Sequence, residues 1–286
     1  MKFTKKILYV IIFLEDLQMR NYSNNIKKKN ISIPILLFRI ISIIIILICL
    51  YRLYNWYLEN KENNQIIDNI LAEVDLPEDN NIIVEFENNT MTPNATITKS
   101  EKLDFTSLSS QNSDTVAWIK INNTEANFPV VQTTNNNYYI NHNFKKQYNS
   151  AGWIFADYRN KFDGTDKNII IYGHNRRDGS MFSSLNNILS ENWYTNQDNH
   201  IVKLYTPSET QKYQIFSIYK IHQSKFDNSI EFADDEQYQN YINTCINNSI
   251  FNFNEDVTTA DKILTVYTCA NNNQYRIILQ AKLIEN

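Results

Sequence analysis

Cysteine, glycine and clustered positive charge are scarce in this 286-residue chain, and these scarcities narrow the classes of protein it can be. The three cysteines, Cys49, Cys245 and Cys269, are an odd and sparse set, which excludes a disulfide framework. The net charge is -4 and the part expected to fold has no basic run, so there is no reason to expect a nucleic-acid partner. The histidines lack ligand spacing and no Cys-x-x-Cys pair exists, so the sequence predicts no metal site.

A long apolar run near the N-terminus is the first informative feature that is present. Residues 31–50, ISIPILLFRIISIIIILICL, contain Arg39 as their only charge. About 20 apolar residues, at a rise of ~1.5 Å each, cross the ~30 Å hydrocarbon layer of a bilayer. The side chain of Arg39 can reach the interface from its place toward the N-terminal end, and a soluble core helix is rarely apolar on every face. We therefore expect a transmembrane anchor over residues 31–54.

The charges that flank this run predict its orientation. Lys27, Lys28 and Lys29 precede the run, whereas charges of both signs follow it. The positive-inside bias places residues 1–30 in the cytoplasm as an N-terminal tail and the folded part outside the cell. No small-residue cleavage site follows Leu50, which favours an uncleaved anchor over a signal peptide. We expect a single-pass protein of the cell membrane with an extracellular domain.

The part beyond the anchor divides into a connection and a folded domain. Apolar residues between Trp56 and Val74 recur at helical spacing, and the stretch after them is polar and contains prolines. Residues 55–115 are thus expected to form an extracellular helix and a linker. The chain is long enough for one good-sized domain with extensions, and we expect that domain over residues 116–286.

The pattern within this domain is one of short β-type runs separated by turn residues. The expected strands are Val116–Ile121, Phe128–Val131, Gly152–Ala156, Asn168–Tyr172, His200–Tyr205, Gln211–Ile221, Lys262–Thr268 and Gln274–Leu283. Helical character is confined to Asp234–Asn247, which begins with an acidic turn, and to a short segment over Met181–Leu189. Eight strands with so few helices predict a mainly β fold, either a closed barrel or a sandwich, rather than a βαβ sheet.

One cysteine has surroundings that suit a reactive thiol. Cys269 ends an apolar strand beside polar residues, whereas Cys49 lies in the apolar run and Cys245 in a helix-like stretch, where cysteine acts as a small hydrophobe. A nucleophilic thiolate needs a nearby cation or imidazole. Arg276, at the start of the next strand, supplies a fixed positive charge and planar donors for a developing oxyanion.

The best candidate for the proton-transfer partner is His174. It follows Gly173 directly after the apolar strand Asn168–Tyr172, so we expect its side chain to emerge where that strand stops. The other three histidines, His142, His200 and His222, lie in polar contexts typical of surface or loop positions.

Several segments, in order, resemble the class B sortases. The text Tyr172-Gly173-His174-Asn175, with Asp178–Phe182 after it, is similar to the family's histidine motif. Leu264–Cys269 resembles the cysteine strand, commonly written T-L-S-T-C, and Arg276 falls where the family's arginine falls. The first strands of the family are matched by Trp118–Ile121, Pro129–Gln132, Gly152–Phe155 and Asp157–Asn160. The likeness runs from about residue 116 to the C-terminus, and a single anchor before the domain fits it.

The resemblance implies an eight-stranded sortase-type β-barrel and a cysteine transpeptidase that needs no cofactor. Cys269 is expected to attack a C-terminal sorting motif of secreted surface proteins and to form a thioacyl intermediate. His174 is expected to protonate the leaving amine and later to help deprotonate the incoming one, and Arg276 to hold the oxyanion. The implied acceptor is an amine of a peptidoglycan precursor, or a pilin lysine.

The resemblance also implies where the substrate binds. Asn136 and Ile140 match positions that line the peptide groove, and Thr268 is expected to form part of its wall beside the cysteine. The sequence departs from the family at Tyr267, where serine is usual and the bulkier side chain is expected to reshape the wall. Ala270 stands where some members carry an acidic group.

Other cysteine chemistries fit the sequence less well. A phosphatase-like loop has five residues between its cysteine and its arginine, whereas six residues, 270–275, stand between Cys269 and Arg276. These six residues also contain no glycine that would allow the backbone to form a tight anion-binding loop. Papain-like peptidases place the cysteine before the histidine, and L,D-transpeptidases expect glycine next to the cysteine, where Thr268 and Ala270 stand. The alternative from a different class is a membrane-anchored, catalytically inactive surface binding protein, in which Cys269, His174 and Arg276 are incidental.

Overall fold

The computed structural model describes residues 33–74, 76, 103–269 and 274–285, with the side chain of Cys269 outside the described part. The chain divides into two compact units, residues 1–55 and 56–286. Helix α2 (Ile33–Glu73) contributes residues to both units. The expected anchor and the expected helix between Trp56 and Val74 are therefore parts of one helix. The expected linker lies almost entirely outside the described residues.

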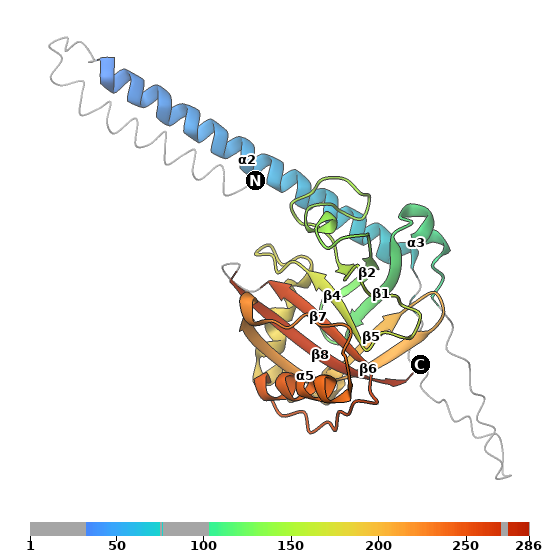
Figure 1. Ribbon diagram of the computed structural model, residues 1–286. Coiled ribbons are helices and arrows are strands. Elements are labelled where there is room, and N and C mark those ends of the chain that lie inside the picture. Colours follow the sequence, from blue (N-terminus) through green and yellow to red (C-terminus); the bar gives the residue numbers. More distant parts are fainter. Residues whose placement is uncertain (1–32, 75, 77–102, 270–273, 286) are drawn as a thin grey trace, which may run out of the picture. The chain divides into compact units, whose positions relative to one another are not determined.

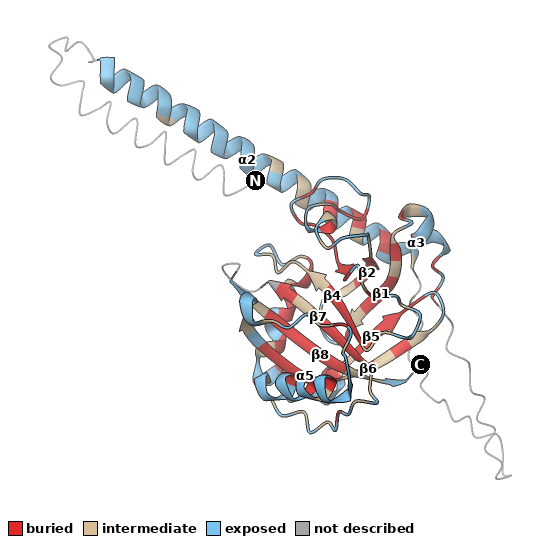
Figure 2. Cartoon of the chain, viewed as in Figure 1, coloured by how far each residue is buried: buried red, intermediate tan, exposed pale blue. Residues whose placement is uncertain are grey.

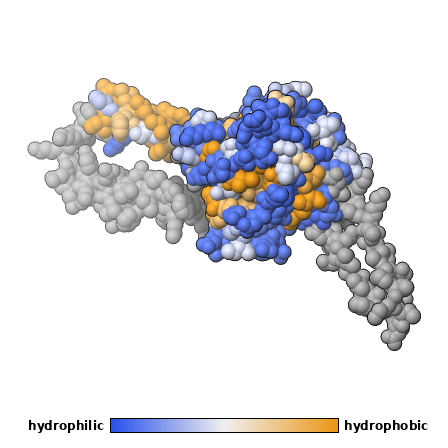
Figure 3. Space-filling view, turned by 60° about the horizontal axis from the view of Figure 1, so that its bottom comes forward, coloured by the Kyte–Doolittle hydropathy of each residue, from blue (hydrophilic) through white to orange (hydrophobic). Residues whose placement is uncertain are grey.

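The first unit consists, in its described part, of the apolar residues of α2 up to residue 55. These residues are exposed almost throughout, and they stand out as hydrophobic in Figure 3. A helix of this length and composition is able to cross a membrane, and it is the one such helix among the described residues. It fits single-pass membrane anchoring, while the orientation of the chain stays a prediction.

The second unit is built on a closed β-barrel. Its strands are β1 (Thr115–Ile121), β2 (Asn127–Val131), β3 (Phe155–Ala156), β4 (Asn168–Gly173), β5 (Ile201–Tyr205), β6 (Thr210–His222), β7 (Ile263–Cys269) and β8 (Tyr275–Glu285). Their order around the barrel is β1-β2-β3-β4-β7-β8-β6-β5. The β2–β3 and β4–β7 pairs are parallel and the others antiparallel (Figure 1). The mainly β prediction is confirmed in its barrel form.

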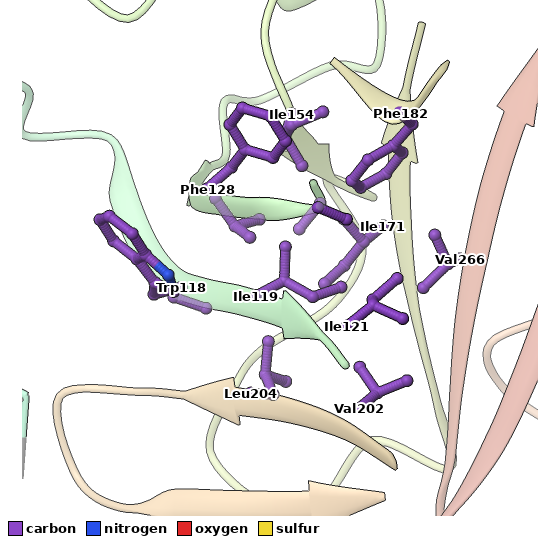
Figure 4. Packing of buried hydrophobic residues seen from close by; sticks show 14 of the residues in the cluster. Trp118, Ile119, Ile121, Phe128, Ile154, Ile171, Phe182, Val202, Leu204 and Val266 are labelled. Carbon is purple, nitrogen blue, oxygen red and sulfur yellow. The ribbon is translucent and has the colours of Figure 1, made fainter. Parts of the chain in front are cut away.

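The barrel is stable because alternate side chains of its strands fill a common interior. Ile119 and Ile121 of β1 lie beside Leu204 and Val202 of β5 and face Val266 of β7 in this interior, as Figure 4 shows. Most strand residues are buried, and Figure 2 shows the barrel as the most buried part of the chain. Each fully buried large side chain contributes about 1.5–3 kcal/mol of hydrophobic stabilisation.

Short helices cover the barrel and close its ends. They are α3 (Thr106–Gln111), η1 (Tyr138–Ile140), η2 (Phe182–Leu189), α4 (Glu191–Tyr194), η3 (Gln197–His200), η4 (Gln223–Lys225) and α5 (Asp235–Asn248). The α5 helix starts at Asp234, whose carboxylate accepts a hydrogen bond from the backbone N–H of Gln237. Its buried face packs against Phe216 and Ile263 and forms a second apolar cluster. The prediction of a helix over 234–247 is confirmed, and the segment over 181–189 is a 3-10 helix.

A buried polar network fixes the register of β4, β7 and β8. The Thr265 hydroxyl donates to Asn168 Oδ1 at 2.8 Å, and the amide groups of Asn168 and Gln280 donate to the hydroxyl of Tyr241 at 3.0 and 2.9 Å. Three of these residues belong to β4, β7 and β8, and Asn168, Thr265 and Gln280 are fully buried. A slip of one residue would separate these groups, and each buried group left without a partner costs about 1–3 kcal/mol.

Asp157, just after β3, is a buried carboxylate with several donors. Arg159 contributes a bidentate pair at 2.8 Å to both carboxylate oxygens, and the Tyr172 hydroxyl and the Asn136 amide donate to Oδ2 at 2.9 Å. Burial raises the pKa of Asp157, but the bonds from Arg159, Tyr172 and Asn136 outweigh it, so the pKa is lowered overall. The Asp157 carboxylate therefore links Asn136, in the loop after β2, to Tyr172 of β4, which lies two residues before His174.

We predict that Asp157→Asn destabilises the protein by about 3 kcal/mol at neutral pH, because it leaves Arg159 without its ion-pair partner. A carboxyl group with a lowered folded-state pKa stabilises above its ordinary pKa of about 3.9, and this contribution disappears as the pH falls through the lowered value. The difference in the free energy of unfolding between Asp157→Asn and the wild type should therefore become smaller only below about pH 3.9. Chemical denaturation measures it, with the exposed Asp163→Asn as the matched control. Equal stability of the two variants at pH 7 would contradict the role of Asp157.

Candidate active site

Strand register brings the three candidate residues to one end of the barrel. In the parallel β4–β7 pair Gly173 lies opposite Thr268, so His174 and Cys269 are the next residues along the two strands. In the antiparallel β7–β8 pair Cys269 lies opposite Arg276. Neighbouring strands are ~4.8 Å apart, and Figure 1 shows β4, β7 and β8 side by side. The backbone thus places His174, Cys269 and Arg276 on three adjacent strands at one level.

The imidazole of His174 is oriented by a backbone carbonyl. Its Nε2–H donates to the carbonyl oxygen of Ile140 at 2.8 Å, so Nδ1 is the nitrogen that accepts a proton. Burial lowers the pKa of His174 and the positive charges of Arg176 and Arg276 lower it further, whereas the bond to Ile140 raises it. The net effect is a lowered pKa, so the imidazole is neutral at neutral pH.

The loop that carries His174 is held by Arg176. The Arg176 guanidinium forms an ion pair with Asp178 at 2.8 Å and donates to the side-chain oxygen of Asn60 in α2. Asp178 in turn accepts hydrogen bonds from the backbone N–H and the hydroxyl of Ser180. These contacts link the loop after β4 to the helix that precedes the domain.

Gly152 allows the close approach of η1 to His174. Its φ is +60°, and a Cβ at this position would lie 2.6 Å from the carbonyl oxygens of Tyr139 and Ile140 and 3.0 Å from Cδ2 of His174. Only glycine avoids both the left-handed strain and these contacts. The carbonyl that orients His174 therefore depends on the residue at position 152.

Arg276 is partly buried, and its guanidinium donates to oxygen atoms of Tyr267, Tyr275 and Gln223, among its partners. Nε donates to the Tyr267 hydroxyl at 2.7 Å, Nη1 to the carbonyl of Tyr275 at 3.1 Å and Nη2 to Oε1 of Gln223 at 2.5 Å. The guanidinium carbon lies 5.5 Å from the centre of the Tyr267 ring. A planar cation is thus fixed in direction next to the end of β7.

The four residues expected to contact substrate differ in their surroundings. The side chain of Ile140 is 42% exposed and Tyr267 is partly buried. The Asn136 amide is bonded to Asp157 and to the backbone N–H of Tyr158, and Asn136 is partly buried. Thr268 is fully buried, and its expected place in the groove wall stays a prediction. Successive residues of a strand face opposite sides, which explains why Thr268 differs from Tyr267.

The remaining histidines and cysteines have other surroundings. His200 is buried and bonds to the carbonyl of Tyr194, so its expected surface or loop placement is wrong. His142 stacks on Tyr138, and His222 bonds to the hydroxyl of Ser224. Cys245 lies on the buried face of α5, and burial raises the pKa of its thiol to about 12, which makes it unreactive.

Some residues of this site were missed in the sequence. Gln223 carries no local signal, because its partner Arg276 is distant in sequence. Asp157 was noted only within the matched segment 157–160, and its bond to Tyr172 was not foreseen. Gly152 had a usable signal, since it is one of four glycines in the chain and opens an expected strand.

We predict that Arg176→Gln raises the pKa of His174, because it removes a positive charge that lowers it. A histidine-ring NMR titration of the full-length protein in detergent measures the pKa directly. Arg177→Gln removes an exposed charge from the next residue and should shift the pKa less. An unchanged pKa in Arg176→Gln would show that this charge does not act on the imidazole.

We predict that Gly152→Ala destabilises the protein more than Gly179→Ala, although both glycines have positive φ. Gly179 has nothing within 4 Å of an added Cβ, so its variant reports the strain of the left-handed backbone, about 1–2 kcal/mol. The further loss in Gly152→Ala, read from chemical denaturation, should be accompanied by a fall in the pKa of His174, because the bond to Ile140 raises that pKa. Identical behaviour of the two variants would contradict the role of Gly152.

Comparison with known proteins gives the family. The Sortase domain family matches residues 119–284. Sortase B of Listeria monocytogenes is 34% identical over 177 residues, which cover 60% of this chain and 71% of that protein. The solved structure of Clostridium perfringens sortase B matches with a TM-score of 0.59 at 33% identity, over 64% of this chain and all of that one. A Staphylococcus aureus sortase B–substrate complex matches with a TM-score of 0.60 at 32% identity, over 63% of this chain and 84% of that one.

The family match covers the barrel except the first four residues of β1 and the last residue of β8, and it includes the three strand ends whose register brings the candidate residues together. The chain belongs to the sortase family, in class B, and is a cysteine transpeptidase.

Proposed function

We propose that this enzyme cleaves a C-terminal sorting motif through a thioacyl intermediate on Cys269 and transfers the protein to an amine of the cell wall or to a pilin lysine. The observation that carries the proposal is the register of β4, β7 and β8, with Thr268 opposite Gly173 and Cys269 opposite Arg276. A thiol, an imidazole and a guanidinium at one level of three adjacent strands are the groups that acyl transfer needs.

In the first half-reaction the Cys269 thiolate attacks the carbonyl carbon of the scissile peptide bond. The carbonyl oxygen becomes an oxyanion, which the Arg276 guanidinium stabilises. As the C–N bond breaks, the imidazolium of His174 gives its Nδ1 proton to the leaving amine. A thioester on Cys269 and a neutral His174 remain.

In the second half-reaction an incoming amine attacks the thioester carbon and loses a proton to Nδ1 of His174. The C–S bond breaks, Cys269 leaves as a thiolate, and the imidazolium is restored. His174 serves as acid and base in turn because Ile140 holds the opposite nitrogen in its protonated form.

The lowered pKa of His174 has a chemical consequence in this cycle. A neutral imidazole is the major form at neutral pH, so the active thiolate–imidazolium pair is the less populated state. The imidazolium, when it forms, is a stronger acid than an ordinary histidine, which favours proton transfer to the leaving amine.

Residues near His174 and Cys269 are the candidates for binding the sorting peptide. A substrate complex is known for the Staphylococcus aureus relative. We place the sorting peptide along Ile140, whose side chain is exposed, and Tyr267, with Asn136 at the border of the groove. The helix able to cross a membrane would hold the domain at the outer surface of the cell membrane, where secreted proteins and peptidoglycan precursors meet. An inactive binding protein is not favoured, since every close relative reported above is a sortase B.

The test uses the full-length protein in detergent with a panel of quenched peptides that carry sortase-type sorting motifs. Mass spectrometry should find a thioacyl adduct on Cys269 with one motif, and cleavage should raise the fluorescence. Cys269→Ala should abolish both signals while Cys245→Ala, which removes the buried thiol, retains them. Cleavage above background in Cys269→Ala, or an adduct on another cysteine, would contradict the proposal.

A further inference from the structure

Two side chains from separate elements fix the guanidinium of Arg276. The Tyr267 hydroxyl, from β7, accepts from Nε at 2.7 Å, and the side-chain oxygen of Gln223, from η4, accepts from Nη2 at 2.5 Å. Both of these acceptors are neutral, so neither forms an ion pair with the guanidinium. A carboxylate in either place would form an ion pair and weaken the attraction of Arg276 for an oxyanion.

The Tyr267 ring is itself held in place. Tyr172 packs against it edge-on, with ring centres 5.2 Å apart, and Phe226 lies at 4.6 Å on a tilted plane. Aromatic pairs at such distances stabilise by about 0.5–1.5 kcal/mol each beyond their burial. The hydroxyl is therefore presented to Arg276 from a ring with little freedom to turn.

Gln223 is fixed by the backbone next to Arg276. Its own N–H donates to the carbonyl of Gln274 at 2.8 Å, and β6 pairs with β8 up to His222 opposite Tyr275. The segment from Gln223 to Phe226 thus contributes both an acceptor for Arg276 and a ring that packs on Tyr267.

Such a fixed arginine has an energetic advantage in catalysis. An arginine side chain carries about 2 kcal/mol of rotamer entropy, which is lost when it is held against a transition state. Donors that are already oriented avoid this cost during the reaction. In the sortase motif that this strand resembles, serine is usual at the position of Tyr267, and its side chain is only one atom longer than Cβ. The longer side chain of Tyr267 brings its hydroxyl within hydrogen-bond distance of Nε of Arg276.

We propose that Tyr267 and Gln223 are positioning residues that hold Arg276 in the direction needed for the oxyanion, and that this enzyme uses a phenol for the purpose. The inference rests on the proposed function, since it requires Arg276 to act on the oxyanion. It changes the expected role of Tyr267 from a groove wall alone to a support of the reaction itself.

The first test is Tyr267→Phe, which keeps the ring and its packing on Tyr172 and Phe226 and removes only the hydroxyl. In peptide cleavage by the full-length protein in detergent, kcat should fall about tenfold while KM stays the same, as for a lost hydrogen bond to a charged group. Gln223→Ala, at an exposed position, should show the same pattern. Tyr148→Phe, which removes an exposed phenol elsewhere, should keep the wild-type kcat.

A double-mutant cycle with Arg276→Ala separates positioning from a general structural effect. The rate of thioester formation on Cys269, measured by mass spectrometry in single turnovers, should fall about 10²–10³-fold in Arg276→Ala. Adding Tyr267→Phe to Arg276→Ala should slow it no further, because the hydroxyl acts through the guanidinium. A full tenfold loss in both backgrounds, or a wild-type kcat in Tyr267→Phe, would overturn the inference. A wild-type rate in Arg276→Ala would instead overturn the oxyanion role in the proposed function.

Discussion

The register of three neighbouring strands is the constraint on which the site depends. His174, Cys269 and Arg276 come from three separate strands or strand ends, and they meet because β7 lies between β4 and β8. The buried hydrogen bonds among Asn168, Thr265, Gln280 and Tyr241 penalise any slip of these strands. Asn168 lies at the opposite end of β4 from the site and Gln280 in the middle of β8, so hydrogen bonds away from the site keep its residues aligned.

Around this frame, neutral acceptors orient His174 and Arg276. A backbone carbonyl, that of Ile140, orients His174, and Gly152 leaves room for it. A phenol and an amide, those of Tyr267 and Gln223, orient Arg276. Burial and the positive charges of Arg176 and Arg276 lower the pKa of His174, so the resting site is a neutral imidazole beside an oriented cation.

Much of the fold could be predicted from the sequence. Alternating apolar residues and turn signals gave seven of the eight strands to within two residues at each end, whereas β3 pairs over only Phe155–Ala156 because Gly152 begins a tight approach to η1 rather than a strand. Their positions at strand ends and their chemistry pointed to His174, Cys269 and Arg276, and the resemblance to class B sortases agreed with this choice. The supports could not be predicted, because Gln223 and Asp157 act on residues brought near by barrel closure. The sequence pattern also did not predict which polar side chains are buried, as fully buried Thr268 and buried His200 illustrate.

We infer that the barrel makes the Cys269 thiol reactive because it brings His174 next to it. The most direct measurement is the rate at which iodoacetamide alkylates each cysteine as a function of pH, resolved by mass spectrometry in the full-length protein. We expect Cys269 to react far faster than Cys245, because burial raises the pKa of the Cys245 thiol to about 12. In His174→Ala, the pH dependence of the Cys269 alkylation rate should move to higher pH. Equal rates for the two cysteines, or a Cys269 profile unchanged by His174→Ala, would contradict it.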